Sequence, residues 1–150
     1  MPAKVAATAT ADDAQFVFEE WHRATTNSDV EALIALYTEY AVMETPMAVI
    51  LAQKGRGELR GIEEVARFLR ANFKDRQKVI SSMDTVRFYR TGQYQFDGHT
   101  LTWEYPRETP HGDSVDVSEV LELRGRKIAV HRIYFGWFMF ASLLAKRTDR

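Results

Sequence analysis

Val115-Asp-Val-Ser-Glu-Val-Leu-Glu-Leu123 has the alternation of a β-strand whose two faces differ in polarity. One face carries Val115, Val117, Glu119, Leu121 and Leu123, and the other carries Asp116, Ser118, Val120 and Glu122. Glu119 is then the only polar residue on the apolar face. A carboxylate in that position loses its solvation unless it is paired, hydrogen-bonded or protonated.

Two interpretations of Glu119 are open at this point. In the first, the sheet twists or a neighbouring loop stops short, and the carboxylate reaches water at a frayed end. In the second, it lies at the floor of a cavity, where it is available for proton transfer or ligand binding. The position of Glu119 in mid-strand, with two apolar same-face neighbours on either side, favours the cavity.

The composition excludes several kinds of partner and site. The chain has 150 residues and a net charge of −1, and no basic tract stands out. We therefore expect no nucleic acid and no anionic membrane surface as partner. The absence of cysteine excludes disulfides, thiolate metal sites and a cysteine nucleophile, and suits a cytoplasmic location. The apolar run from Ile133 to Leu144 is too short to span a bilayer.

Periodicity predicts three helices in the first half of the chain. The first runs from Asp12 to about Thr26, with Phe16, Val17, Trp21 and Ala24 on one stripe. Ser28 and Glu31 match a capping box for the second, whose apolar spacing includes Tyr37. The third is expected over residues 62–73. Residues 41–51 are expected to be extended, residues 53–61 to form a surface loop, and residues 1–11 to form a loose tail before a single domain over 12–150.

The second half is expected to consist of strands. Residues 79–90 read as one long strand, and Asp97-Gly98 is a strong hairpin signal. Residues 99–105 then alternate, with His99, Leu101, Trp103 and Tyr105 on one face. Residues 106–114 are expected to be a turn region. Helices followed by hairpins predict an α+β domain in which three helices pack against one face of a curved antiparallel sheet.

The register of the last hairpin determines what faces Glu119. A three-residue loop at 124–126 pairs Leu123 with Lys127 and sets Glu119 opposite His131 on the same face. Ile133, Phe135 and Trp137 would line that face too. The other face is too apolar for free exposure, and a second subunit is its simplest cover, so we expect a homodimer. That outer face carries Ile128, Val130, Arg132 and Tyr134.

Several segments resemble the nuclear transport factor 2-like superfamily, namely Asn27-Ser-Asp-Val-Glu-Ala-Leu-Ile-Ala-Leu-Tyr37, Ala41-Val-Met-Glu-Thr-Pro46 and Leu59-Arg-Gly-Ile-Glu-Glu-Val65. The later segments Trp103-Glu-Tyr-Pro-Arg107, Glu119-Val-Leu-Glu-Leu123 and His131-Arg-Ile-Tyr-Phe-Gly-Trp137 look like its SnoaL-like, polyketide-cyclase branch. The resemblance covers about residues 12–138. It implies a cone of curved sheet closed by three helices, a deep pocket, and a dimer formed through the sheet.

The superfamily also includes ketosteroid isomerase, to which the chain is distantly similar, and this allows a comparison residue by residue. The isomerase's oxyanion-hole tyrosine matches Trp21, and its catalytic aspartate before a proline matches Thr45. Its second, protonated aspartate matches Glu119. Two of the three roles are replaced, so steroid isomerisation by that mechanism is not implied, whereas the carboxyl group at Glu119 is retained.

Together these observations predict acid–base chemistry on a hydrophobic small molecule, without a cofactor: isomerisation, cyclisation, dehydration or epoxide hydrolysis. Glu119 and His131 are the catalytic candidates. The residues expected to shape the binding site are Trp21, Thr45, His99, Trp103, Tyr105, Val117, Ile133 and Phe135. A non-catalytic ligand binder and a dimerisation module with a vestigial cavity are the rival hypotheses.

Two histidines and a carboxylate on one face could bind a metal ion. His99, Glu119 and His131 on one face would match a non-haem iron arrangement, but their spacing is not diagnostic, so we expect no bound metal. His22 and His111 are predicted to be surface residues.

Overall fold

The computed structural model describes residues 6–50, 55–81, 94–108, 114–137, 140–141 and 144–145. Side chains within these ranges are described except at 74–81, 105–108 and 114–116. The elements are α1 (Ala11–Thr26), α2 (Val30–Ala35), β1 (Tyr37–Glu44), α3 (Pro46–Ile50), β2 (Glu58–Arg60), α4 (Ile62–Ser81), β3 (Gln95–Phe96), β4 (Thr100–Glu108), β5 (Ser114–Arg124) and β6 (Lys127–Phe135).

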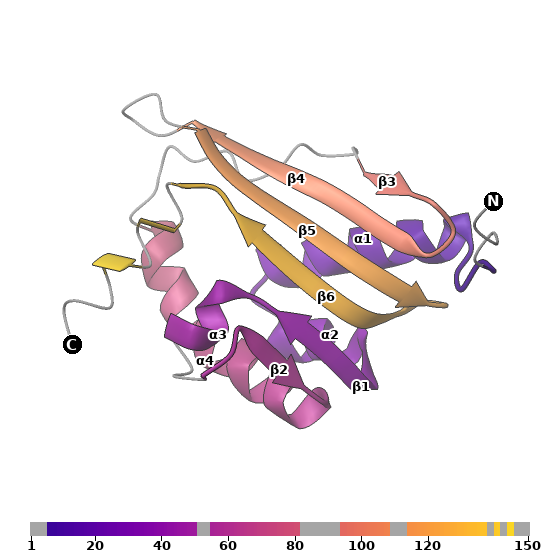
Figure 1. Ribbon diagram of the computed structural model, residues 1–150, viewed down its shortest axis with the longest axis horizontal. Helices are drawn as coiled ribbons and strands as arrows, with labels where there is room; N and C mark the ends of the chain where they lie inside the picture. Colours follow the sequence, from indigo (N-terminus) through magenta and orange to yellow (C-terminus); the bar gives the residue numbers. More distant parts are fainter. Residues whose placement is uncertain are drawn as a thin grey trace.

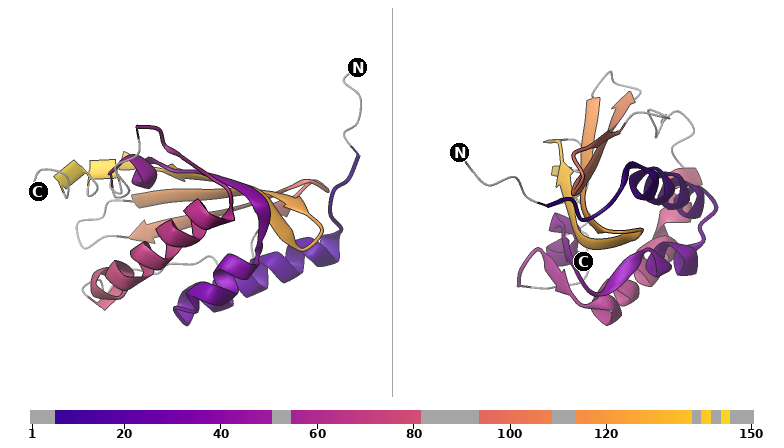
Figure 2. Two further views of the ribbon diagram at one scale, coloured as in Figure 1. Left: turned by 90° about the horizontal axis from the view of Figure 1, so that it is seen from below. Right: turned by 90° about the vertical axis from the view of Figure 1, so that its right-hand side faces the viewer.

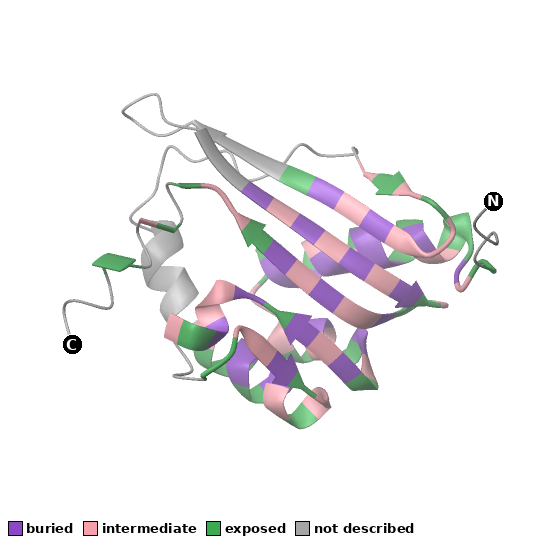
Figure 3. Cartoon of the chain, in the orientation of Figure 1, coloured by how far each residue is buried: buried purple, intermediate pink, exposed green. Residues whose placement is uncertain are grey.

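The predicted α+β class is confirmed. Within the described ranges, six strands form one curved sheet in the order β2-β1-β6-β5-β4-β3, and α1, α2 and α4 lie along its concave side (Figures 1 and 2). The sheet is antiparallel except where β1 runs parallel to β6. The predicted antiparallel sheet did not include this parallel pair. Buried and more exposed residues alternate along β5 and β6 (Figure 3), so the core lies between the concave face and the helices.

The first helix forms as predicted, and its cap explains where it begins. The Thr10 hydroxyl accepts a hydrogen bond from the Asp13 amide, and the Asp13 carboxylate accepts one from the Thr10 amide. Val17, Trp21 and Ala24 are buried. Phe16 is exposed, contrary to its predicted place on the core stripe, and its ring packs against the Arg126 guanidinium at 4.6 Å.

The capping box predicted at Ser28 and Glu31 is wrong. Ser28 has a positive φ of 55° and ends the turn after α1. Asp29 caps α2 instead, because its carboxylate accepts from the Ala32 amide at 3.1 Å. The helix then ends at Ala35, and Tyr37, predicted to be helical, begins β1 next to β6.

Three other boundaries differ from those predicted. Pro46 occupies the first position of α3 within the segment expected to be extended, since proline suits the first turn of a helix. Part of the predicted loop 53–61 forms β2, which pairs with β1. The helix α4 continues to Ser81 through residues with good helix propensity, so the strand predicted at 79–90 does not begin where expected. The rest of that strand lies outside the described residues.

The two C-terminal hairpins form, with a different register and longer strands. Residues 106–108 and 114 belong to β4 and β5 rather than to the predicted turn. Arg124 pairs with Lys127 across a two-residue turn, and a bulge between β5 and β6 shifts the register by one further residue. Glu119 therefore pairs with Ile133, not His131. The two shifts restore the original parity, which keeps His131 on the face of Glu119.

The bulge also changes the outer face of the sheet. Ile128 is buried, so its predicted place on that face is wrong. Arg132 lies on that face as predicted, with Nη2 2.6 Å from Glu122 Oε1 and Nε 3.6 Å from Glu44 Oε2. These ion pairs link β1, β6 and β5 across the outer face.

The N-terminal segment joins two hairpin turns. The Thr8 and Ala9 amides donate to the Gly98 carbonyl at 2.9 and 3.2 Å, and the Gly125 amide donates to the Thr8 carbonyl at 2.9 Å. The Thr8 hydroxyl donates to the Leu123 carbonyl at 2.6 Å and lies 2.8 Å from His99 Nδ1. The segment expected to be a loose tail is thus hydrogen-bonded to the sheet from Thr8 onward.

Thr8→Val should lower the free energy of unfolding by about 1–3 kcal/mol, because it removes the hydroxyl and leaves the Leu123 carbonyl and the His99 ring without this partner. Urea denaturation measures the change. Thr26→Val, at an exposed position on the last turn of α1, is the matched control and should change stability little. Equal losses in the two variants would contradict the assigned role of Thr8.

Candidate functional site

Three cross-strand rows form the concave face around Glu119. Trp103, Glu119 and Ile133 are paired across β4, β5 and β6. Leu101, Leu121 and His131 form the row on one side. The row on the other side contains Tyr105, Val117 and Phe135. Most of the predicted site residues on the strands therefore share one face, although the side chain of Tyr105 lies outside the described part.

Glu119 is buried, with 5% of its surface exposed, so its interpretation as a carboxylate at a frayed end is wrong. Its Oε2 lies 2.5 Å from Nε2 of His131, which is 2% exposed. The two residues are diagonal rather than directly opposite, a separation that side chains on one face can bridge. Glu119 and His131 are thus close together as expected, although the strand register that brings them together differs from the predicted one.

Tyr37 is the second hydrogen-bond partner of His131, and no pattern in the sequence indicated it. Its hydroxyl lies 2.7 Å from His131 Nδ1, so both ring nitrogens are engaged. Burial raises the pKa of Tyr37, the negative charge of Glu119 raises it further, and a hydrogen bond with Trp21 opposes the rise. Tyr37 therefore remains a neutral hydroxyl that can donate to His131.

The contacts of His131 allow a series of hydrogen bonds that ends at Glu119. An indole N–H can only donate, and Trp21 acts on Tyr37 as a nearby donor that opposes the rise in its pKa. If the Tyr37 hydroxyl donates to His131 Nδ1, the proton of the neutral ring is on Nε2 and points to Glu119. In that arrangement the Tyr37 and His131 donors act in series on the Glu119 carboxyl group.

Aromatic rings line the helix side of the site. The Trp21 and Trp103 rings lie 5.2 Å apart, and Phe18 lies 5.3 Å from Trp103. His22 was predicted to be a surface residue, but its ring lies 4.2 Å from that of Phe18 and 5.1 Å from that of Trp103. Burial lowers the pKa of His22, whereas its bond to the Phe18 carbonyl and the charge of Glu119 raise it.

Two predicted site residues have other partners. The Thr45 hydroxyl, although buried, accepts from the Met47 amide at 3.3 Å at the start of α3. His99 contacts Thr8, and its Nε2 lies 3.8 Å from Glu122 on the outer face. His99 therefore does not complete a triad with Glu119 and His131. Within the described ranges, no three His, Cys, Asp or Glu side chains are grouped so as to hold a metal ion, and His111 lies outside them.

No protein-family model and no curated protein matches the sequence. Solved structures do match its fold. A SnoaL-like protein of unknown function from Burkholderia thailandensis is 21% identical, with a TM-score of 0.60 over 85% of this chain and 98% of that one. An NTF2-like protein from Anabaena variabilis is 20% identical, with a TM-score of 0.57 over 91% and 96%. TerC, co-crystallised with polyporic acid, is 14% identical, with a TM-score of 0.60 over 89% and 98%.

Tyr37→Phe should lower the free energy of unfolding by about 1–3 kcal/mol, because His131 Nδ1 loses its partner inside the core. Tyr40→Phe is the control, since Tyr40 lies on the same strand and is 81% exposed. Chemical denaturation of both variants measures the difference. A Tyr37→Phe protein as stable as the Tyr40→Phe protein would contradict the hydrogen bond to His131.

Proposed function

We propose that this chain, which has the fold of the nuclear transport factor 2-like and SnoaL-like proteins, binds a hydrophobic small molecule on the concave face of its sheet and carries out acid–base chemistry on it. Folds of this type bind small ligands, and the proteins whose solved structures share it are mostly of unknown function. The proposal for the reaction therefore depends on the residues of this chain.

The observation that carries the proposal is the buried Glu119–His131 pair. A carboxylate surrounded by apolar side chains costs stability, and in the proposed arrangement His131, itself held by the Tyr37 hydroxyl, supplies the hydrogen bond that offsets this cost. The Glu119 side chain keeps 7% of its surface accessible, against 2% for His131. The carboxylate is thus the end of the pair that a ligand could contact, beside the rings of Trp21 and Trp103.

In the proposed reaction, Glu119 accepts a proton from the substrate and His131 holds the carboxylate in position. In an isomerisation or cyclisation the electrons of the broken bond remain on the substrate, and Glu119 returns the proton to another substrate atom. In a dehydration these electrons form the double bond and expel the hydroxyl group, which leaves as water with the proton from Glu119. Epoxide hydrolysis, with Glu119 activating a water, uses the same carboxylate. Trp103, Val117, Ile133 and Phe135 would shape the apolar surface around the reacting atoms. A site without a cofactor and a cytoplasmic location remain part of this proposal.

The alternative is a ligand-binding protein without turnover. The fold of TerC, co-crystallised with polyporic acid, supports a small-molecule role equally well whether or not Glu119 is catalytic. The two functions differ in what happens when Glu119 can no longer exchange a proton.

Glu119→Gln should reduce turnover by at least about a hundredfold while leaving ligand affinity nearly intact, because the amide keeps the shape and cannot take up a proton. Binding of polyporic acid and of a panel of hydrophobic ketones and epoxides is followed by tryptophan fluorescence, and turnover of the binders by chromatography. Glu104→Gln, at an exposed position of β4, is the control. Full turnover in the Glu119→Gln protein would contradict the catalytic role, and no binding by any probe would contradict the site itself.

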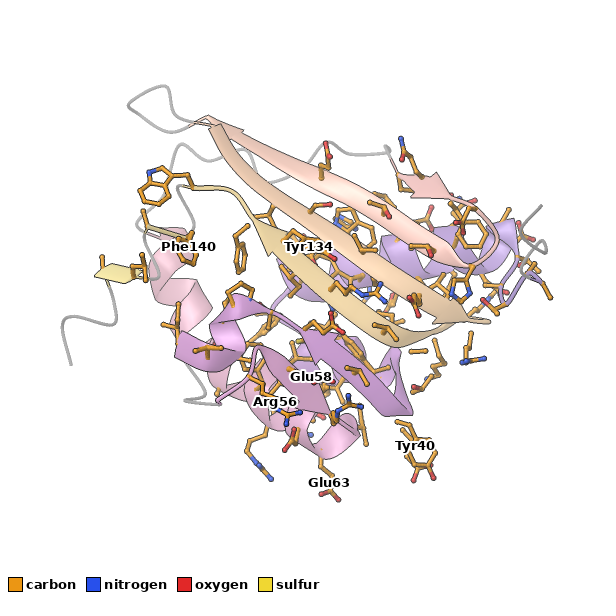
Figure 4. The ribbon with its side chains drawn as sticks, viewed as in Figure 1. Tyr40, Arg56, Glu58, Glu63, Tyr134 and Phe140 are labelled. Atoms are coloured by element: carbon orange, nitrogen blue, oxygen red, sulfur yellow. The ribbon has the colours of Figure 1, made fainter. Side chains whose placement is uncertain are left out.

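We also propose that two copies associate through the outer face of β6. Tyr134, labelled in Figure 4, is 56% exposed there, and Trp137 just beyond the strand is 76% exposed. Trp137 was expected to line the inner face and does not. Val130 lies on the same outer face, which would bring apolar contacts and the ion pairs of Arg132 into one two-fold interface.

Sedimentation at micromolar concentration should give twice the 17.3 kDa mass of one chain. Tyr134→Glu should shift the protein to the monomer, because it places a charge in the proposed interface. Tyr40→Glu changes an exposed tyrosine of β1 in the same way and should leave the dimer intact. A wild-type protein that sediments only as a monomer would contradict the proposal.

A further inference from the structure

His22 is a second titratable side chain beside Glu119. It lies on α1 directly after Trp21, and its ring is 5.1 Å from that of Trp103. Trp103 pairs with Glu119 across β4 and β5. The negative charge of Glu119 raises the pKa of His22. The two groups are therefore coupled across the interface between the helix and the sheet.

The hydrogen bond to α1 determines the tautomer of His22. Nδ1 lies 2.6 Å from the backbone carbonyl of Phe18, and a carbonyl oxygen can only accept. Nδ1 therefore carries a proton, and Nε2 is the basic nitrogen of the neutral ring. Burial, the largest influence on this group, lowers the pKa of His22 and favours the neutral form.

His22 differs from His131 and Tyr37 in its access to water. His131 and Tyr37 are buried, with 2% and 5% of their surface exposed, so a proton placed on them has no direct contact with solvent. His22 is half-buried. Of these three titratable neighbours, it is the one that contacts both solvent and the aromatic rings beside Glu119.

We infer that His22 is the group through which Glu119 exchanges its proton with solvent. The inference rests on the proposed acid–base role of Glu119. It adds the route by which Glu119 returns to its ionised form after it has taken a proton from the substrate. A proton taken from the substrate moves from the Glu119 carboxyl oxygen to His22 Nε2, directly or through one water. The carboxylate regains its negative charge, which stabilises the imidazolium formed. The imidazolium then releases the proton to bulk water, and the reverse sequence supplies one.

The first test measures proton exchange in the protein without any ligand. The proton between His131 Nε2 and Glu119 is followed by NMR in protein labelled with 15N-histidine, and its exchange with water by saturation transfer. His22→Asn should slow this exchange by at least about tenfold, because a positioned proton-transfer group contributes about a hundredfold or more. His99→Asn, a histidine on the other side of the sheet, should leave the rate unchanged. An unchanged or faster rate in the His22→Asn protein overturns the inference.

The second test leaves His22 in place, so it does not depend on how the His22→Asn protein folds. The titration of His22 is followed by long-range 1H–15N correlations in the wild-type, Glu119→Gln and Glu122→Gln proteins. Glu119→Gln should lower the titration midpoint of His22, because the charge that stabilises the imidazolium is removed. Glu122→Gln, which removes a carboxylate from the outer face, should not. An unchanged midpoint in Glu119→Gln, or a neutral His22 protonated on Nε2, overturns the inference.

These tests separate this inference from the proposed function. If Glu119→Gln loses turnover while His22→Asn leaves proton exchange unchanged, Glu119 is catalytic and another route resets it. If His22 is coupled to Glu119 but no probe binds, the proton route exists and the proposed reaction fails.

Discussion

The hydrogen bond between His131 and Glu119 is the constraint on which the interior depends. An ionised carboxylate that is removed from water costs several kcal/mol unless donors replace its hydration. Here the donor is the imidazole of the next strand, at 2.5 Å. A shift of one residue between β5 and β6 would turn His131 to the outer face and leave the carboxylate without it. The parallel pairing of β1 with β6 brings Tyr37 beside the same histidine.

The proposed arrangement gives Glu119 neutral partners, and this has a chemical consequence. A lysine or arginine at the position of His131 would form an ion pair and reduce the basicity of the carboxylate. In the proposed arrangement Tyr37 and His131 instead stabilise the charge by hydrogen bonds alone, so the carboxylate can still accept a proton. Arg132, the next residue after His131, is a permanent cation, but it points to the outer face and pairs with Glu122.

The sequence predicted the fold and the strand faces because alternation and turn residues report directly on which side chains face the core. It placed Glu119 and His131 on one face although the register was wrong, since the turn and the bulge each shift the pairing by one residue. It could not predict Tyr37, because helical spacing continues up to that residue and only the pairing with β6 makes it a strand. His22 was assigned to the surface because a single polar residue on a helix gives no periodic signal. The outer position of His99 depends on contacts with Thr8, which lies 91 residues away in the chain.

The most direct test of this account is the protonation state of His131 in the wild-type protein at neutral pH, measured by long-range 1H–15N NMR of the imidazole. The account predicts a neutral ring with its proton on Nε2 and a bare Nδ1 that accepts from Tyr37. A ring protonated on Nδ1 alone would mean that Glu119 holds the shared proton and that the chain of donors runs in the opposite direction. A doubly protonated ring would mean that Glu119 is held by an ion pair, and either result would contradict the account.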